Sequence, residues 1–194
     1  MEAFRLDEAA ARAEAALALA ASCRQARYEG RAAWIARAAA YRMGAATSPD
    51  RELCDLAAQA GVAELEAFVC LNEGAVAFRE GDLALAADLA TRAQRVWEAL
   101  GKTHVALLAR ALAIASIGSV DPDEAASISS RALAGPLPTI SLQIIGLLAR
   151  AWPAHTPRPA WPIHALVAAV PARHQGTRME VVSVDEAIAL CAAS

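Results

Sequence analysis

Histidine and cysteine residues are the first candidates for chemistry, because imidazole and thiolate groups act as metal ligands, bases and nucleophiles. The four histidines form no H-E-x-x-H or Glu-x-x-His pattern, and they stand at His104, His155, His164 and His174. His174 and Cys191 could join a base to a thiol, but a surface histidine and a packed thiol are the favoured interpretation. No G-x-S-x-G element or phosphate-binding loop is present. We expect a protein that is not an enzyme and uses no cofactor and no metal.

The four cysteines are widely spaced, and they are Cys23, Cys54, Cys70 and Cys191. They form no C-x-x-C pair, so a zinc knuckle or a dithiol redox motif is not expected. Each lies among apolar residues at helical spacing. We expect buried, reduced thiols that pack as small hydrophobic side chains.

Composition predicts an all-α fold. Hydrophobic residues make up 57% of the 194 residues and aromatic residues only 5%, because more than a quarter of the chain is alanine. Alanine has the highest helix propensity and lets helix axes approach closely. We therefore expect helices separated by thin layers of small side chains.

Charge and hydropathy narrow the classes of partner. The formal charge is −3, and the 18 basic residues form no stripe that could neutralise phosphates, so we expect no nucleic-acid partner. The sequence near Gly61 resembles the turn of a helix-turn-helix motif. The charged residues between Val62 and Phe78 are all acidic, which argues against DNA recognition. Charged residues interrupt every alanine-rich segment, and the acidic N-terminus lacks the order of a signal peptide. We expect a soluble cytoplasmic protein without a membrane partner.

The N-terminal third predicts a helix hairpin and a short helix. A first helix is expected over residues 7–29, ended by Gly30, and a second over residues 32–45 with Trp34 on its apolar stripe. Ser48 and Pro49 have the types favoured at the N-cap and first positions of a helix. The short helix that they open should end near Gly61.

The middle of the chain is more regular. Helices are expected over residues 63–79 and 83–100, separated by Gly81 and closed by Gly101. Thr103 is the expected cap of a helix over 105–117, Asp121 opens a capping box for a helix to about 134, and Thr139 is the expected cap of a helix reaching about 151. These elements form successive hairpins.

A spacing of 39 residues relates two of these hairpins. Asp82 and Asp121 lie 39 residues apart, and the same offset carries Arg92 onto Arg131. The pair Glu29-Gly30 lies 51 residues before Glu80-Gly81, which suggests an earlier, degenerate repeat followed by an inserted helix. Repeats that stack in this way bury a continuous core.

Residues 153–194 differ from the rest. Five prolines between residues 153 and 171 prevent a long helix, so 153–161 should be an extended linker. Short elements are expected over 163–170 and from Ser183 to about 192, and residues 179–182 have strand character. We divide the chain into a helical repeat domain, 1–152, and a proline-rich segment, 153–194, whose short helices pack on or extend from it.

Residues 71–93 resemble the tetratricopeptide repeat (TPR) family. Gly74, the Gly81-Asp82 turn, Ala86 and Ala93 stand at the small-residue and turn positions of the family pattern, and Phe78 stands where an aromatic residue is usual. The following frame matches partly, with Val120 in place of the turn glycine. The length of the second helix is closer to the variety of about 40 residues found in bacterial regulators. The resemblance implies a short right-handed α-solenoid of antiparallel helix hairpins with an irregular proline-rich C-terminal tail.

The resemblance also implies an adaptor that binds a peptide or a partner helix on the concave face of the array. Carried over by position, the partner-binding residues are Phe68, Leu71, Asn72, Phe78, Arg79 and Arg110. Ordinary core packing is an equally weighted interpretation of Phe68, Leu71 and Phe78. A clamp for a terminal carboxylate is not expected, because Leu107 and Ala111 replace its basic residues.

Two other interpretations stay open at this point. A regulatory or sensor module would hold a small ligand or peptide in an enclosed pocket with a few polar groups, whereas an adaptor needs an open groove. A homodimer through the C-terminal tail is the third interpretation.

Overall fold

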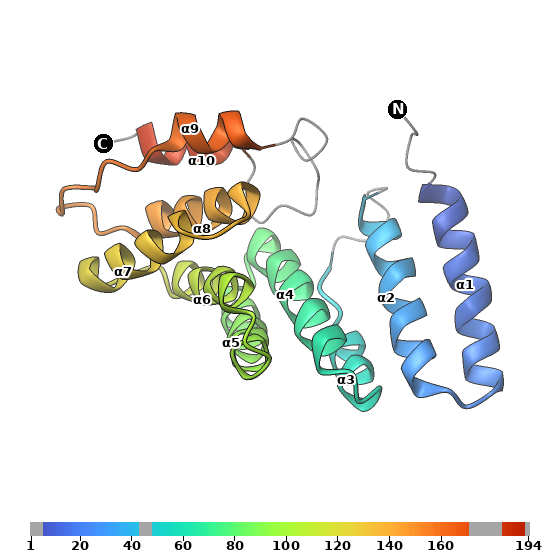
Figure 1. Ribbon diagram of the computed structural model, residues 1–194. Coiled ribbons are helices and arrows are strands. Elements are labelled where there is room, and N and C mark those ends of the chain that lie inside the picture. Colours follow the sequence, from blue (N-terminus) through green and yellow to red (C-terminus); the bar gives the residue numbers. More distant parts are fainter. Residues whose placement is uncertain (1–5, 43–47, 171–183, 193–194) are drawn as a thin grey trace.

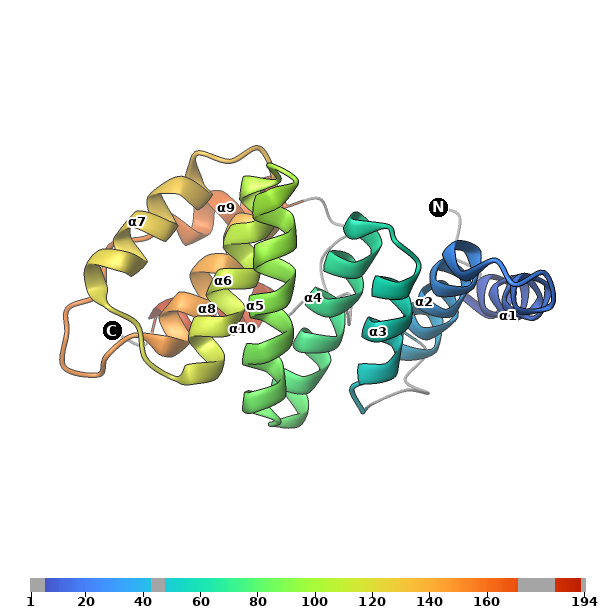
Figure 2. The same ribbon diagram turned by 90° about the horizontal axis from the view of Figure 1, so that it is seen from below.

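The structure is a computed structural model that describes residues 6–42, 48–170 and 184–192. In these ranges every regular element is a helix, as the composition predicted. The helices follow one another across the molecule from α1 at one end, and α9 and α10 cover α8 (Figures 1 and 2). Their bounds are α1 (Leu6–Ser22), α2 (Ala26–Arg42), α3 (Arg51–Gln59), α4 (Ala63–Glu80), α5 (Leu83–Ala99), α6 (Thr103–Ile117), α7 (Pro122–Leu133), α8 (Pro138–Ala151), α9 (Ile163–Ala169) and α10 (Val184–Ala192).

The turn between α4 and α5 forms as predicted from local sequence. Gly81 ends α4 in the left-handed region at φ 85°, which a side chain would disfavour. The Asp82 side chain then accepts a hydrogen bond of 3.1 Å from the backbone N–H of Leu85 and caps α5. These two residues reverse the chain, so α4 and α5 pack against each other along their lengths.

The predicted boundaries of the first two helices are wrong. Helix α1 ends at Ser22, and the chain turns through Arg24, which has a φ of 52°. Gly30, the expected terminator, lies inside α2. A Cβ atom at Gly30 would stand 3.3 Å from Ala60 Cβ and 3.4 Å from the Leu56 carbonyl oxygen. Gly30 therefore allows α2 and α3 to pack closely and does not end a helix.

Three predicted N-caps are also wrong. Asp50, two residues after Ser48, caps α3 by accepting a hydrogen bond of 3.0 Å from the Leu53 N–H. Thr103 is the first residue of α6, and Thr139 lies within α8, so neither is a cap. Asp121 does cap α7, with Pro122 following it at the first helical position, as predicted.

The hairpin of α6 and α7 differs from the hairpin of α4 and α5 at its turn. Gly118, with a φ of 81°, ends α6 two residues before the expected turn position, and Val120 is buried. The following helix α7 packs less extensively on α6 than α5 packs on α4. The large contacts of α6 are with α5 and α8. The 39-residue spacing therefore relates two hairpins that differ in how far they close.

Helix α8 is the most enclosed element. All residues from Ser141 to Ala149 are buried, and α6, α7, α9 and α10 pack around them. This stretch carries no charged residue, as expected for a helix that is covered on every side. Its large side chains form the centre of the core together with Leu112 of α6.

The C-terminal segment packs back on this core. Residues 153–162 contain no helix, and α9 and α10 then contact both α8 and each other. The indole N–H of Trp152 donates to the Thr156 carbonyl oxygen at 2.9 Å, which fixes the start of the segment. Residues 179–182, expected as extended coil despite their strand character, lie outside the described residues, as do the expected cap Ser183 and His174.

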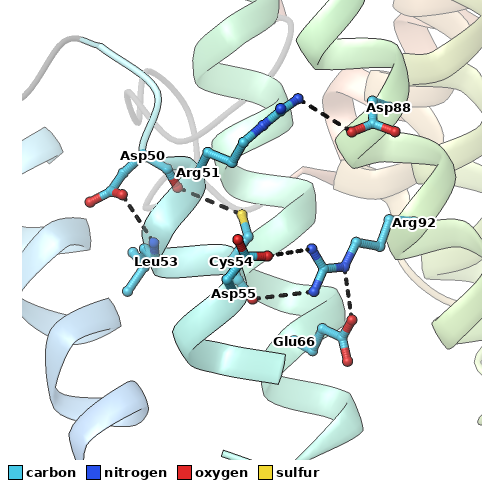
Figure 3. A network of polar contacts seen from close by, with 8 residues as sticks. All are labelled: Asp50, Arg51, Leu53, Cys54, Asp55, Glu66, Asp88 and Arg92. Carbon is cyan, nitrogen blue, oxygen red and sulfur yellow. Dashed lines mark hydrogen bonds and ion pairs between the residues drawn. The ribbon is translucent and has the colours of Figure 1, made fainter. Parts of the chain in front are cut away.

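Helix α3 is held by polar contacts from α5. Arg92 reaches from α5 and donates to Glu66 of α4 at 2.8 Å and to Asp55 of α3 at 3.1 Å (Figure 3). A more exposed ion pair of 3.5 Å joins Arg51 of α3 to Asp88 of α5. Because these contacts cross three helices, α3 is an integral part of the array and packs against both α2 and α4.

Candidate partner-binding groove

A groove lies between α2 and α4. Its larger hollow has a volume of about 280 Å³, and its lining residues are Arg31, Trp34, Val62, Glu64, Leu65 and Phe68. A smaller hollow follows toward the C-terminal ends of the same two helices, lined by Trp34, Arg37, Ala38, Asn72, Glu73, Val76 and Arg79. Trp34 lines both hollows, so they are neighbours between α2 and α4, and together they are called the groove.

Two aromatic rings, Trp34 and Phe68, line the larger hollow, and a third, Trp97, supports Phe68 from the core. The Phe68 ring lies edge-on to Trp34 of α2, with centroids 5.4 Å apart, and edge-on to Trp97 of α5, at 6.1 Å. Trp97 is buried, yet Phe68 is 43% exposed. Edge-to-face contacts of this kind fix ring orientation. The groove therefore presents a large apolar side chain that is already held in one position.

A buried ion pair forms the back of the smaller hollow. Glu73 of α4, whose side chain is only 3% exposed, accepts hydrogen bonds of 3.1 Å from both Nε and Nη2 of Arg37 in α2. The backbone N–H of Asp50 donates to the same carboxylate at 2.8 Å, and Arg37 also donates to the Ser48 carbonyl oxygen. Glu73 of α4 thus joins this helix to α2 and to the start of α3.

Three of the predicted partner-binding residues lie in this groove. Phe68, Asn72 and Arg79 line it from α4. The amide nitrogen of Asn72 donates to the Phe68 carbonyl oxygen at 2.7 Å, so this donor is used within α4. Arg79 is exposed at the far end.

The other three predicted residues lie elsewhere. Leu71 and Phe78 are buried in the core, because α4 packs on several helices and only one of its sides faces the groove. Arg150 of α8 covers the Phe78 ring at 4.8 Å from its centroid. Arg110 of α6 donates to Glu124 of α7 at 2.9 Å and so bridges two helices. The core interpretation left open for Leu71 and Phe78 agrees with this burial, whereas that of Phe68 does not.

Sequence reasoning missed the contribution of α2 to the groove. Trp34 was noted only as part of an apolar stripe, and Arg31, Arg37 and Glu73 were not singled out. Arg37 and Glu73 lie 36 residues apart, so no local pattern pairs them. The one signal that could have drawn attention was an arginine and a tryptophan three residues apart on a predicted helix in a chain with few aromatic residues.

The thiols follow the prediction in part. Cys54 and Cys70 are buried, but Cys23 is exposed because α1 ends beside it. Contact with the Cys70 thiol and burial raise the pKa of Cys54. Burial raises the pKa of Cys191, which is half-buried, to about 11. Cys54 and Cys191 are therefore protonated at neutral pH.

None of the helices in the described ranges is long and apolar enough to cross a membrane. No family model, curated protein or solved structure matches the chain.

Proposed function

We propose that the protein is a non-enzymatic adaptor in which a TPR-like, right-handed solenoid of helix hairpins presents the groove between α2 and α4 to a partner protein. In this proposal α2, α4 and α6 are the first helices of successive hairpins, and their shared side is the concave face. The similar roles of Gly30 and Gly74, each of which lets a first helix approach the next helix closely, support this arrangement. The location that we propose is the cytoplasm.

The observation that carries the proposal is the exposed Phe68 ring, held between two tryptophans at the edge of an open hollow. Preordered aromatic groups are frequent anchors of protein interfaces, because their contact area costs little conformational entropy. A volume of about 280 Å³ suits one or two apolar side chains better than a whole small molecule.

The length of the groove indicates the form of the partner. Leu65 and Arg79 are separated by 14 residues of α4, which corresponds to about 21 Å of helix. A helix of about four turns, or an extended peptide of about six residues, spans that distance. We favour a helix, because two neighbouring helices form a natural groove for a third.

Capture of partners from lysate of the source organism tests this function. The bait is the full chain, as wild type, as Phe68→Ala, and as Asn72→Ala/Arg79→Glu. Leu83→Ala is the matched control, because Leu83 is also 43% exposed but begins α5, away from the groove. We expect both groove variants to lose a partner that wild type and Leu83→Ala retain. Equal recovery of the same partners by all four baits would rule out the groove as the binding surface.

The alternative function is a regulatory or sensor module that binds a small ligand or peptide. One observation favours it: a second cavity, of about 400 Å³, lies beside α9 and α10 and combines apolar walls with polar groups. Titration with small ligands distinguishes the two functions. A sensor needs a ligand in this cavity, whereas an adaptor binds its partner through the α2 and α4 groove whether or not the cavity is filled.

A further inference from the structure

The cavity near the C-terminus is built from three parts of the proline-rich segment. Its lining residues are Arg158, Pro159, Ala160, Trp161, Ile163, His164, Ile188 and Cys191. The first four precede α9, the next two begin α9, and the last two belong to α10. Figure 1 shows α9 and α10 side by side over α8, so the cavity stands on the side of the molecule away from α1 and α2.

Several contacts hold its walls in place. Trp161 packs edge-on against Trp152 with ring centroids 5.7 Å apart. Arg158 donates from Nη1 to the carbonyl oxygen of Leu190 and so ties the linker to α10. Ile163 is buried against the core. The cavity is therefore a fixed feature of the packed segment.

Arg158 supplies hydrogen-bond donors at the cavity. Its bond to Leu190 uses one nitrogen of a guanidinium that has five N–H donors in all. The indole nitrogen of Trp161 is covered by protein atoms, so this residue contributes its ring, and not its N–H, to the cavity wall.

Among the described residues, the lining carries no negative charge. None of the described lining residues is an aspartate or a glutamate, and Glu186 of α10 pairs with Arg150 of α8 at 3.3 Å outside the lining. The Cys191 thiol is neutral at pH 7, since burial raises its pKa to about 11. Arg158 therefore gives the cavity a positive charge that no described lining group opposes.

We propose that this cavity binds a small organic acid, with its carboxylate on Arg158 and its apolar body against Ile163, Ile188 and the Trp161 ring. A planar carboxylate matches the fork of a guanidinium. The volume of about 400 Å³ is within the range of small-molecule sites. This site is distinct from the α2 and α4 groove, so its test does not depend on the adaptor proposal.

Calorimetric titration of the full chain tests the proposal with two acids, octanoate and indole-3-acetate, each beside its neutral primary amide. We expect at least one acid to saturate the protein below about 10 mM and to bind tenfold or more tightly than its amide, because only the acid pairs with Arg158. Failure of both acids to bind, or a preference of less than tenfold over the amide for every acid that binds, overturns the proposal.

Variants locate the binding. Arg158→Gln should weaken the acid by tenfold or more, whereas Arg131→Gln, an exposed arginine of α7, should leave it unchanged. Circular dichroism melting confirms that each variant is folded, and Arg158→Met, which also removes the charge, serves if Arg158→Gln is not. In ¹H–¹⁵N spectra the indole N–H signal of Trp161, assigned with Trp161→Phe, should move on addition of the acid. Unchanged affinity in the Arg158 variant tested, or an unmoved Trp161 signal at saturation, would show that the acid binds elsewhere.

Discussion

The helix pair α1 and α2 and the helix pair α4 and α5 both pack closely but differ in what they bury. Among the side chains of α1 and α2 whose burial is described, the buried ones are all alanines, and they are Ala13, Ala20, Ala32 and Ala39. Between α4 and α5 the buried set includes Val69, Leu89 and Trp97. A buried alanine methyl is worth about 0.8 kcal/mol, against about 1.5–3 kcal/mol for a larger side chain. Helices α1 and α2 therefore combine a high helix propensity with little stabilisation from tertiary packing.

This difference matters for the groove, because its two walls come from the two regions. The α2 wall is joined to α4 through Trp34 and Phe68, and through Arg37 and Glu73. We expect α1 and α2 to open at a lower free energy than α4 to α8. A partner bound in the groove would stabilise this weaker wall by mass action.

The largest effect should come from the middle region. Leu89 is 1% exposed and packs where α4 crosses α5, so Leu89→Ala should lower the free energy of unfolding by about 2–5 kcal/mol. The control, Leu19→Ala in α1, removes a side chain that is 65% exposed and should change it by less than about 0.5 kcal/mol. Urea unfolding followed by circular dichroism measures both, and equal losses would contradict the comparison.

Loss of the Glu73 carboxylate should separate the two regions. Glu73→Ala leaves Arg37 without its partner and the Asp50 N–H without its acceptor. The expected cost is about 3 kcal/mol, at the lower end for a buried pair because Arg37 keeps some contact with water.

Hydrogen exchange distinguishes this effect from general destabilisation. In Glu73→Ala the amides of α1 and α2 should exchange faster, with a smaller change in α5. Glu52→Ala, at an exposed position of α3, is the control. Uniform loss of protection in all helices would show that the regions do not open separately.

The two interior glycines sharpen the comparison. Gly74→Leu should cost about 3 kcal/mol, because even a Cβ there would lie 3.4 Å from Leu89 Cβ and a longer side chain has no room. Gly74→Ala only reaches ordinary contact distance and should stay within about 1 kcal/mol of wild type. In Gly30→Ala the new Cβ would lie closer to its neighbour, at 3.3 Å from Ala60 Cβ. This variant should therefore gain less stability than Gly74→Ala.

Thermal melting of the three glycine variants checks these expectations. An unchanged melting temperature for Gly74→Leu would contradict close packing of α4 on α5. A larger rise in melting temperature for Gly30→Ala than for Gly74→Ala would show that α3 moves aside for a new methyl group more easily than α5 does.

Acid pH should act on the middle region through His104. Burial lowers the pKa of His104, whose ring packs against Gly135 and lies 3.3 Å from Ser141 Oγ through Nε2. The folded state therefore prefers the neutral ring. The unfolded state takes up the proton first as the pH falls below the ordinary value of about 6.5, so stability is full above that value and decreases below it.

Melting temperatures between pH 7.5 and pH 5 measure this dependence. His104→Gln should reduce the decrease at acid pH, and His155→Gln, at an exposed position, should not. No histidine precedes residue 104, so at pH 5 the protection of amides, corrected for the intrinsic exchange rate at that pH, should fall first around α6 and α8 and not in α1 and α2. An identical pH dependence in both variants would contradict the assignment.

Elements whose ends are set by local chemistry were predictable. The bounds of α4 and α5 agree with the expected helices within one residue, because Gly81 supplies the left-handed turn and Asp82 the cap. In contrast, the turn at Arg24 contains neither glycine nor proline, and Gly30 was taken for a terminator. The role of Gly30 depends on Ala60 and Leu56 in another helix, which no local pattern reveals.

The candidate site shows the same division. The resemblance to the TPR family placed Phe68, Asn72 and Arg79 among the partner-binding residues, and the structure puts all three in the groove. The resemblance could not tell that Leu71 and Phe78 turn into the core or that Trp34 supplies the opposite wall. Periodicity gives the angle of a residue around its own helix, whereas burial depends on which helices surround it.

By itself the sequence determined that the chain is helical, where the α4 and α5 hairpin turns, and that alanine and glycine let its helices approach closely. Only the tertiary structure decided that α2 and α4 share a groove, that Glu73 joins them, and that the C-terminal helices enclose a cavity beside α8. The reason is physical: turns and caps depend on groups a few residues apart, whereas a groove, a buried ion pair and a cavity require residues far apart in the chain to meet.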